Sequence, residues 1–131
     1  MKTRILIVDD EPDIAHLLAL TLHQDGYETS TLHSAEEFKA KAVALNPQLI
    51  ILDIRLGNAD GPTTYNYLLT KGLDKNIPVI FLSGLVPEES RMPAAPGRKY
   101  VLHSKPFDYE KLSEDIRLLL NPRPPGVGLS A

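Results

Sequence analysis

The apolar run Leu-Ile-Ile-Leu at residues 49–52 leads directly into a single carboxylate, Asp53. An apolar run without polar alternation is typical of a strand that is buried on both faces, as in the interior of a parallel sheet. In open α/β sheets ligands bind at the carboxyl ends of the strands, which is where Asp53 would lie. Asp53 alone is equally well explained as a residue that caps a turn, so the other strand ends decide between the two interpretations.

The same pattern recurs at three other places along the chain. The runs and the polar residues that follow them are 5–8 with Asp9 and Asp10, 77–82 with Ser83, and 100–102 with Lys105. A looser alternation at 27–32 is typical of a strand nearer an edge. Because parallel strands end at one edge of a sheet, we expect these polar side chains to lie around Asp53 and to form a site.

Helical patterns separate the strand-like runs. The expected helices extend from Pro12 towards Gly26, from Ser34 to about Leu45, from Pro62 towards Gly72, and from Asp108 towards Asn121. The expected inward face of the first helix consists of Ile14, Leu17, Leu18, Thr21 and Leu22. The segment 87–97 contains Pro87, Pro93 and Pro96, so any helix there is expected to be short or irregular, because proline inside a helix costs about 3 kcal/mol.

Strands that alternate with helices predict a doubly wound α/β domain. We expect a five-stranded parallel sheet with strand order 2-1-3-4-5, right-handed connections and helices on both faces. In that order the first and third strands are neighbours, so Asp9 and Asp10 would face Asp53. The domain is expected to span residues 1–121, and the proline- and glycine-rich residues 122–131 to form a disordered tail or the start of a linker.

Composition excludes several classes of function. The 131 residues fit one domain and contain no cysteine, which excludes disulfides, thiolate metal sites and cysteine nucleophiles. The net charge of −3 and the lack of a basic run argue against direct nucleic-acid binding. The apolar runs are too short to cross a membrane and the start of the chain lacks the apolar core of a signal peptide, so we expect a cytoplasmic location without membrane contact.

The expected group of three carboxylates favours a particular chemistry. Like charges disfavour joint ionisation, and a hard divalent cation such as Mg²⁺, which prefers oxygen ligands, removes that repulsion. Lys105 supplies a mobile positive charge for a phosphoryl oxygen, and Ser83 supplies a hydroxyl donor. Because a carboxylate can attack phosphorus, these residues favour phosphoryl transfer onto Asp53.

Five short stretches carry a resemblance to a known family. They are Ile-Leu-Ile-Val-Asp-Asp-Glu-Pro at 5–12, Leu-Ile-Ile-Leu-Asp at 49–53, Asp-Gly at 60–61, Ile-Pro-Val-Ile-Phe-Leu-Ser-Gly at 77–84 and Ser-Lys-Pro-Phe at 104–107. In this order, at the expected strand ends, they resemble the receiver domain of two-component response regulators over about residues 3–120. The resemblance implies a flavodoxin-like topology, in agreement with the strand order expected from the sequence pattern.

The resemblance implies that Asp53 is the phosphoacceptor. It also implies that Asp9, Asp10 and Asp53 bind Mg²⁺, with the Arg55 backbone carbonyl as a further ligand. Ser83 is implied as the hydroxyl residue that moves towards the phosphoryl group, and Lys105 as the cation that contacts that group. A cis peptide bond between Lys105 and Pro106 is also implied. One departure is Leu102, because the family usually has an aromatic residue there that reports phosphorylation.

The implied function is a phosphorylation-controlled receiver and not an enzyme with turnover. Its implied partners are a sensor histidine kinase or histidine phosphotransfer protein and an unknown downstream protein or fused output domain. One alternative is a pseudo-receiver that binds proteins without phosphorylation. The presence of both acidic residues Asp9 and Asp10, of Asp53 and of Lys105 argues against this alternative. Another is an aspartate-nucleophile phosphohydrolase, but Arg55 occupies the position where such enzymes commonly have a second aspartate. A flavin-binding relative is disfavoured because Asp9 and Asp10 would repel its phosphate.

The histidines are interpreted as structural residues. His16, His23 and His33 fall on polar positions where solvated side chains are expected. His103 lies on the last expected strand, where a hydrogen-bonded core residue is expected.

Overall fold

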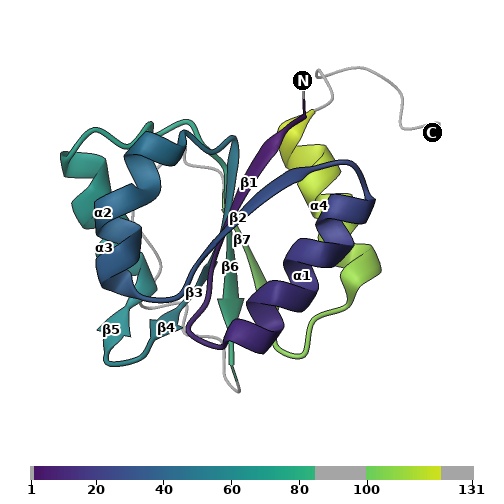
Figure 1. Cartoon of the computed structure of the whole chain (residues 1–131), viewed down its shortest axis with the longest axis horizontal. Helices are drawn as coiled ribbons and strands as arrows, with labels where there is room; N and C mark the ends of the chain where they lie inside the picture. Colours follow the sequence, from purple (N-terminus) through teal and green to yellow (C-terminus); the bar gives the residue numbers. More distant parts are fainter. Residues whose placement is uncertain (1, 85–99, 122–131) are drawn as a thin grey trace.

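A central parallel sheet with helices on both faces is the framework of the molecule (Figure 1). The computed structural model describes residues 2–84 and 100–121. In chain order the elements are β1 (Arg4–Val8), α1 (Pro12–Gln24), β2 (Glu28–Leu32), α2 (Ala35–Leu45), β3 (Leu49–Asp53), β4 (Arg55–Leu56), β5 (Ala59–Asp60), α3 (Gly61–Thr70), β6 (Val79–Ser83), β7 (Tyr100–Ser104) and α4 (Tyr109–Leu120). Helices α1 to α4 confirm the helices expected outside residues 87–97. No helix of the described part has the length and apolar character that a membrane span requires.

The sheet contains five parallel strands in the order β2-β1-β3-β6-β7. This confirms the predicted order 2-1-3-4-5, with β6 and β7 as the fourth and fifth strands of the sheet. Strand β3 lies at the centre, and all five of its residues are buried. Its pairing places Leu52 opposite Val8 of β1 and Asp53 opposite Leu82 of β6, so the strands end together at one edge.

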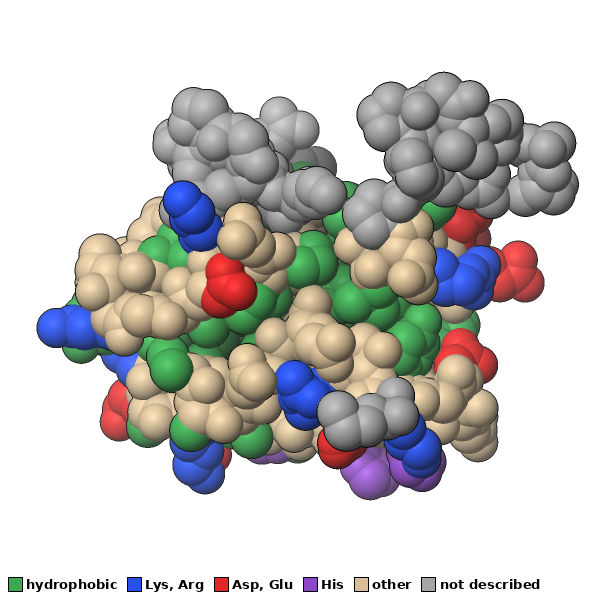
Figure 2. Space-filling view, turned by 90° about the horizontal axis from the view of Figure 1, so that it is seen from above, with side chains coloured by type: hydrophobic (Ala, Val, Ile, Leu, Met, Phe, Trp, Pro, Cys, Tyr) green, Lys and Arg blue, Asp and Glu red, His purple; other side chains and the backbone are tan. Residues whose placement is uncertain are grey.

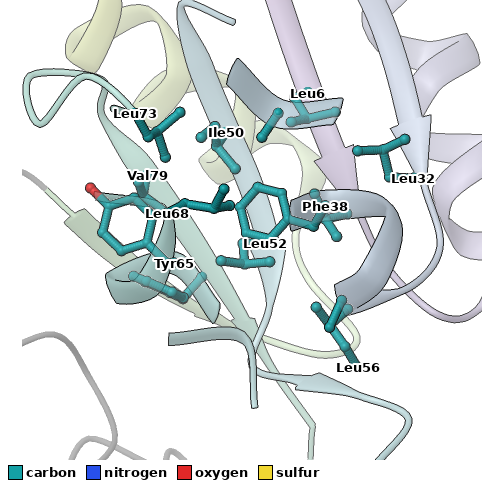
Figure 3. Packing of buried hydrophobic residues seen from close by; sticks show 14 of the residues in the cluster. Leu6, Leu32, Phe38, Ile50, Leu52, Leu56, Tyr65, Leu68, Leu73 and Val79 are labelled. Carbon is teal, nitrogen blue, oxygen red and sulfur yellow. The ribbon is translucent and has the colours of Figure 1, made fainter. Parts of the chain in front are cut away.

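The sheet divides the hydrophobic core into two layers, because successive side chains of a strand point to opposite faces. Ile50 and Leu52 of β3 belong to the layer under α2 and α3. Leu49 and Ile51 belong to the layer under α1 and α4. In Figure 3 the fully buried Phe38 of α2 lies beside Leu52 in the first layer. Burying such a side chain completely stabilises the fold by roughly 1.5–3 kcal/mol.

The buried face of helix α1 matches the predicted one only in part, because Leu18 and Leu22 are buried as predicted but Leu17 is not. Its buried residues are Ala15, Leu18 and Leu22, whereas Leu17 is 66% exposed. The prediction that Leu17 lies in the core is therefore wrong. Residues three and four positions apart share one line along a helix, and Leu17 falls about 100° to one side of Leu18.

Helix α2 begins with a capping box formed by Ser34 and Glu37. Ser34 Oγ accepts a hydrogen bond from the Glu37 N–H at 3.1 Å. Glu37 Oε1 accepts a hydrogen bond from the His33 N–H at 2.8 Å. In most capping boxes this side chain binds the N–H of the capping residue itself, which here is Ser34. The capping residues therefore tie the start of α2 to the end of β2.

Residues 55–60, between β3 and α3, contain a short antiparallel hairpin made of β4 and β5. Leu56 gives the hairpin a hydrophobic anchor, because this side chain is 4% exposed and lies in the core layer under α2 and α3. The connection passes through Gly57, whose φ of 63° is in the left-handed region that favours glycine. The chain therefore keeps a regular structure immediately after β3.

His103 on β7 makes the hydrogen bond expected of a core histidine. Its Nε2 donates to Asp115 Oδ2 of α4 at 2.7 Å, and the residue is half-buried. The pair joins the edge strand β7 to the helix that covers it.

Two sequence expectations lie outside the described residues, namely the irregular helix at 87–97 and the tail at 122–131. Among the described side chains, basic and acidic groups are interspersed in the view from the amino ends of the strands (Figure 2). The site predicted from the sequence lies at the opposite end of the sheet, where the strands finish.

Candidate functional site

Four carboxylates meet where β1 and β3 end. The register of the two strands brings Asp9 and Asp53 to the same edge of the sheet. The turn between β1 and α1 adds Asp10 and Glu11. One oxygen from each of the four residues, here called the acidic cluster, lies within 4.8 Å of the others. Asp9 and Asp53 are its buried members, at 0% and 6% exposure.

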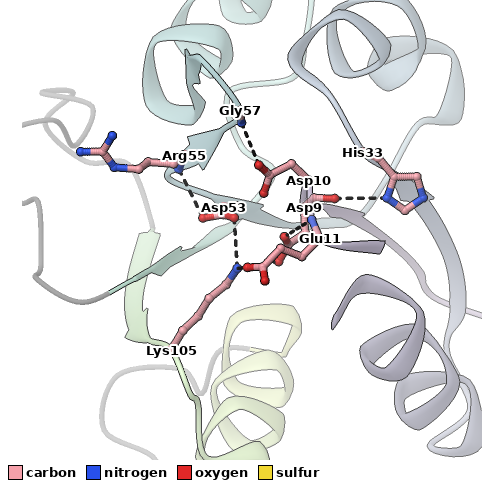
Figure 4. A network of polar contacts seen from close by, with 8 residues as sticks. All are labelled: Asp9, Asp10, Glu11, His33, Asp53, Arg55, Gly57 and Lys105. Carbon is pink, nitrogen blue, oxygen red and sulfur yellow. Dashed lines mark hydrogen bonds and ion pairs between the residues drawn. The ribbon is translucent and has the colours of Figure 1, made fainter. Parts of the chain in front are cut away.

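Lys105 reaches the acidic cluster from the end of β7. Its backbone N–H donates to the Ser83 carbonyl at 2.7 Å, which anchors it beside the end of β6. Its Nζ lies 3.0 Å from Asp53 Oδ2, 2.9 Å from Asp9 Oδ2 and 3.2 Å from Glu11 Oε1 (Figure 4). One cation is therefore shared by three carboxylates.

The hairpin after β3 contacts two members of the acidic cluster through backbone N–H groups. Arg55 N–H donates to Asp53 Oδ1 at 3.3 Å, and the Arg55 side chain points away from the cluster (Figure 4). Gly57 N–H donates to Asp10 Oδ2 at 2.9 Å. The hairpin therefore connects the end of β3 to the turn before α1.

The structure brings together most of the site residues predicted from the sequence. Those that meet are Asp9, Asp10, Asp53 and Lys105. Ser83 is 1% exposed and lies one position beyond the β6 residue that pairs with Asp53. The peptide bond between Lys105 and Pro106 is cis, as the resemblance implied.

Sequence reasoning missed two residues of the site. Glu11 was not among the expected site residues, although its place directly after Asp9 and Asp10 was a signal for a third acidic group. His33 is half-buried, and its Nδ1 donates to the Asp9 carbonyl oxygen at 3.1 Å (Figure 4). The interpretation of His33 as a solvated surface residue is therefore wrong, and no local pattern indicated this contact.

Gly61 allows the start of α3 to pass directly against the backbone of β3. Its N–H donates to the Ile54 carbonyl at 2.7 Å. A β-carbon at this position would overlap the Asp53 carbonyl oxygen and would lie 3.2 Å from the Asp53 carbonyl carbon. Only glycine fits this close approach, so the Asp-Gly pair at 60–61 helps to determine where Asp53 lies.

Burial is the largest cause of a raised pKa at Asp53. Burial and the negative charge of Asp9 raise this pKa from 3.8 to about 6, against the opposing effects of Lys105 and the Arg55 N–H. For Lys105, burial lowers the pKa, but hydrogen bonds and charges from Asp9 and Asp53 outweigh it and raise the pKa above its ordinary value. Lys105 therefore stays positively charged, while the carboxylates around it repel one another.

A family model for the response regulator receiver domain matches residues 5–117. The chain belongs to this family. The match extends from β1 into α4 and so includes the acidic cluster and Lys105. The resemblance noted in the sequence is therefore confirmed, and the chain is a receiver domain of the two-component response regulators.

Curated relatives of this receiver domain are regulatory proteins. The chain is 33% identical over 117 residues to the DNA-binding dual master transcriptional regulator RpaA of Synechocystis sp., covering 89% of this chain and 48% of RpaA. It is 36% identical over 114 residues to the nitrogen assimilation regulatory protein NtrX of Azorhizobium caulinodans, covering 86% of this chain and 25% of NtrX. The receiver domain described here thus spans about half or less of the length of these relatives.

Solved structures share the fold of this receiver domain. A two-component response regulator from Clostridium difficile superposes with a TM-score of 0.78 at 24% identity, over 92% of this chain and 98% of that one. NtrX from Brucella abortus superposes with a TM-score of 0.77 at 31% identity, over 92% of this chain and 27% of that one. The first likeness supports the fold alone, and the second agrees with the family assignment.

The acidic cluster fits the Mg²⁺ ion that receiver domains generally bind at such a cluster. Asp9 Oδ1 accepts from the Glu11 N–H at 2.9 Å. Asp9 Oδ2 is buried, and the group that approaches it is the Lys105 ammonium at 2.9 Å. A buried carboxylate oxygen in this state is a suitable ligand for a hard cation, which would also relieve the repulsion that raises the pKa of Asp53.

The raised pKa of Asp53 predicts how stability depends on pH without divalent cations. The folded state binds the proton of the Asp53 carboxyl group more tightly than the unfolded state does. The contribution of this group to the free energy of unfolding is therefore fully present below about pH 4 and is lost as the pH rises through about 6. The loss corresponds to about 3 kcal/mol of unfolding free energy. Asp53→Asn is therefore expected to melt at a higher temperature than the wild type at about pH 7.5, and to show a flatter pH profile.

Thermal melts in EDTA across this pH range measure the effect. The matched control is Glu114→Gln, the same change from carboxylate to amide at an exposed position of α4, which should leave the profile unchanged. Identical profiles for wild type and Asp53→Asn would show that the pKa of Asp53 is not raised.

Proposed function

We propose that this receiver domain accepts a phosphoryl group on Asp53 from a sensor histidine kinase or a histidine phosphotransfer protein. The proposed ligands of Mg²⁺ are Asp9, Asp10, Asp53 and the backbone carbonyl of Arg55. The phosphorylated state then changes binding to a downstream protein or to an output domain joined to this chain.

One observation carries the proposal. The buried carboxylate of Asp53 ends the central strand, with Lys105 Nζ at 3.0 Å and three further carboxylates within 4.8 Å. Phosphoryl transfer needs positioning, a metal and charge neutralisation more than covalent chemistry from the protein. Hydrolytic turnover would also need a group that activates water. Arg55 occupies the position where aspartate-nucleophile phosphohydrolases commonly have a second aspartate, and its side chain points away from the cluster (Figure 4). We therefore propose phosphoryl transfer without hydrolytic turnover.

Asp53 is the proposed nucleophile. A carboxylate oxygen attacks phosphorus, and the phosphorus–nitrogen bond to the donor's imidazole breaks as the phosphorus–oxygen bond to Asp53 forms. With a pKa of about 6, Asp53 is mostly ionised at neutral pH and can therefore act as the attacking group. Bound Mg²⁺ would neutralise charge on the phosphoryl oxygens and on the carboxylates.

Lys105 and Ser83 are the proposed partners of the phosphoryl oxygens. Lys105 Nζ is engaged by three carboxylates before transfer, so the phosphoryl group competes with them for this cation. A phosphoryl group carries about −1.5 to −2 charges, which favours its contact with Lys105 over a single carboxylate. Ser83, at the end of the adjacent strand β6, supplies an O–H donor to another oxygen.

An apolar groove beside Lys105 supports a protein as the phosphodonor. The groove has a volume of about 460 Å³ and lies between α1 and the chain that follows β7. Leu17, which is 66% exposed, lines it from α1, and Pro106 and Phe107 line it from the other side. A large exposed apolar side chain beside a reactive site is typical of a protein contact, so a donor seated here would present its phosphohistidine close to Asp53.

Intact mass spectrometry after incubation with acetyl phosphate and Mg²⁺ tests the proposal. The wild type is expected to gain one phosphoryl group, which maps to the peptide that contains Asp53, and to gain none when EDTA is present from the start. Asp53→Asn should gain none, whereas the control Asp13→Asn, at an exposed position of α1, should be labelled like the wild type. Equal labelling of wild type and Asp53→Asn would assign the phosphoryl group to another residue.

A further inference from the structure

The backbone of Asp9 is bonded on both sides to the end of β2. Its N–H donates to the Leu32 carbonyl at 3.0 Å. Its carbonyl accepts from Nδ1 of the His33 imidazole at 3.1 Å. A carbonyl oxygen can only accept, so the hydrogen of this bond resides on Nδ1. The imidazole therefore holds the peptide group that joins Asp9 to Asp10.

His33 is itself held by the first turn of α2. Its backbone N–H donates to Glu37 Oε1 at 2.8 Å, and the Glu37 N–H donates to Ser34 Oγ at 3.1 Å. A short series of hydrogen bonds thus extends from the start of α2, through His33, to the peptide between two members of the acidic cluster. Figure 4 shows the last of these bonds, from the His33 imidazole to the Asp9 carbonyl.

The peptide between Asp9 and Asp10 determines where both carboxylates point. Asp9 is completely buried, and its side chain can follow only the direction that its backbone allows. Asp10 is exposed, and its carboxylate accepts from the Gly57 N–H at 2.9 Å. A rotation of the peptide that joins them would move both proposed metal ligands at once.

We propose that His33 is a positioning residue for Mg²⁺ binding, which acts by fixing the peptide between Asp9 and Asp10. This inference rests on the proposed function, because it takes both aspartates as metal ligands. Groups that orient ligands without touching the metal change metal affinity by about 10–100-fold when they are removed. His33 supplies such a contact from outside the acidic cluster.

Calorimetric titration of the unphosphorylated chain with Mg²⁺ tests the inference. His33→Ala is expected to bind Mg²⁺ about tenfold more weakly, and His33→Asn to stay within about threefold of the wild type. The asparagine Nδ2 is the same number of bonds from the backbone as the imidazole Nδ1, so it can donate to the Asp9 carbonyl. His33→Gln places its donor one bond farther out and should resemble His33→Ala. His23→Ala, at an exposed position of α1, is the matched control.

A second measurement separates positioning of the metal site from general stability. Labelling of His33→Ala by acetyl phosphate should be slow at low Mg²⁺ and should recover at saturating Mg²⁺, which a loss of folded protein would not do. If His33→Ala does not fold, the comparison of His33→Asn with His33→Gln decides the question alone.

The outcomes distinguish this inference from the proposed function. Equal Mg²⁺ affinity in wild type, His33→Asn and His33→Gln would overturn the role of His33 and leave the role of Asp53 untouched. A wild type that binds no Mg²⁺ would overturn both. A wild type that binds Mg²⁺ but is not phosphorylated would overturn the proposed function alone, and the ranking of the variants would still support the role of His33.

Discussion

Replacement of Gly61 by alanine is expected to lower the free energy of unfolding by at least about 2–3 kcal/mol and to weaken Mg²⁺ binding. The new β-carbon would overlap the Asp53 carbonyl oxygen and would lie 3.3 Å from the Ile54 carbonyl oxygen. Both oxygens belong to the backbone, which cannot rotate away as the end of a flexible side chain can. Either the end of β3 or the start of α3 must move, and each movement displaces Asp53.

Thermal melts and calorimetric titration with Mg²⁺ measure the two effects of Gly61→Ala. The melting temperature is expected to fall by roughly 10 °C. Gly84→Ala is the matched control, because a β-carbon at Gly84 meets no described atom within 4 Å and the backbone there needs no left-handed conformation. A melting temperature like that of Gly84→Ala would mean that the backbone adapts without displacing the end of β3.

Replacement of Lys105 by methionine is expected to have a comparable effect on stability through charge alone. Methionine keeps much of the length and apolar character of the side chain but leaves Asp9 and Asp53 buried without their cation. Breaking a buried ion pair by removing one partner is strongly destabilising, and we expect a loss of about 2–4 kcal/mol at about pH 7.5 in EDTA. The raised pKa of Lys105 means that its stabilising contribution is present at every pH below its ordinary pKa of 10.5.

The loss caused by Lys105→Met is expected to depend on pH and on metal. At about pH 5 it should be smaller, because Asp53 then takes up a proton and no longer repels Asp9. Saturating Mg²⁺ should restore part of the stability of Lys105→Met. Labelling by acetyl phosphate should nevertheless stay low, because the positive charge of Lys105 is missing. Thermal melts at both pH values measure this, with the exposed Lys111→Met of α4 as the control. An equal loss at both pH values would indicate that packing, and not charge, explains the effect of Lys105.

The strands and their order could be predicted because each depends on a strong local pattern. A run such as 49–52 has no polar face, and such a run is stable only where the strand is covered on both sides. Once alternating strands and helices indicate parallel strands, all strand ends lie at one edge. The meeting of Asp9, Asp53 and Lys105 followed from this rule, before any distance was known.

The features that could not be predicted are those in which the structure of one segment depends on its packing against a distant part of the chain. The inward face of α1 could not be chosen from its own residues, since both Leu17 and Leu18 are apolar and only the position of the sheet decides between them. The hairpin at 55–60 depends on the burial of Leu56 in the core layer under α2 and α3. These choices are made by packing between segments, which local periodicity does not record.

The sequence by itself therefore determined the fold class, the strand order, and the aspartates of the acidic cluster with their cation, Lys105. The tertiary structure alone decided how these residues are held. His33 contacts the Asp9 carbonyl across 24 positions of sequence, and Gly57 contacts Asp10 across 47. Such hydrogen bonds depend on distances and angles between separately folded segments, and these exist only once the two core layers have packed on the sheet.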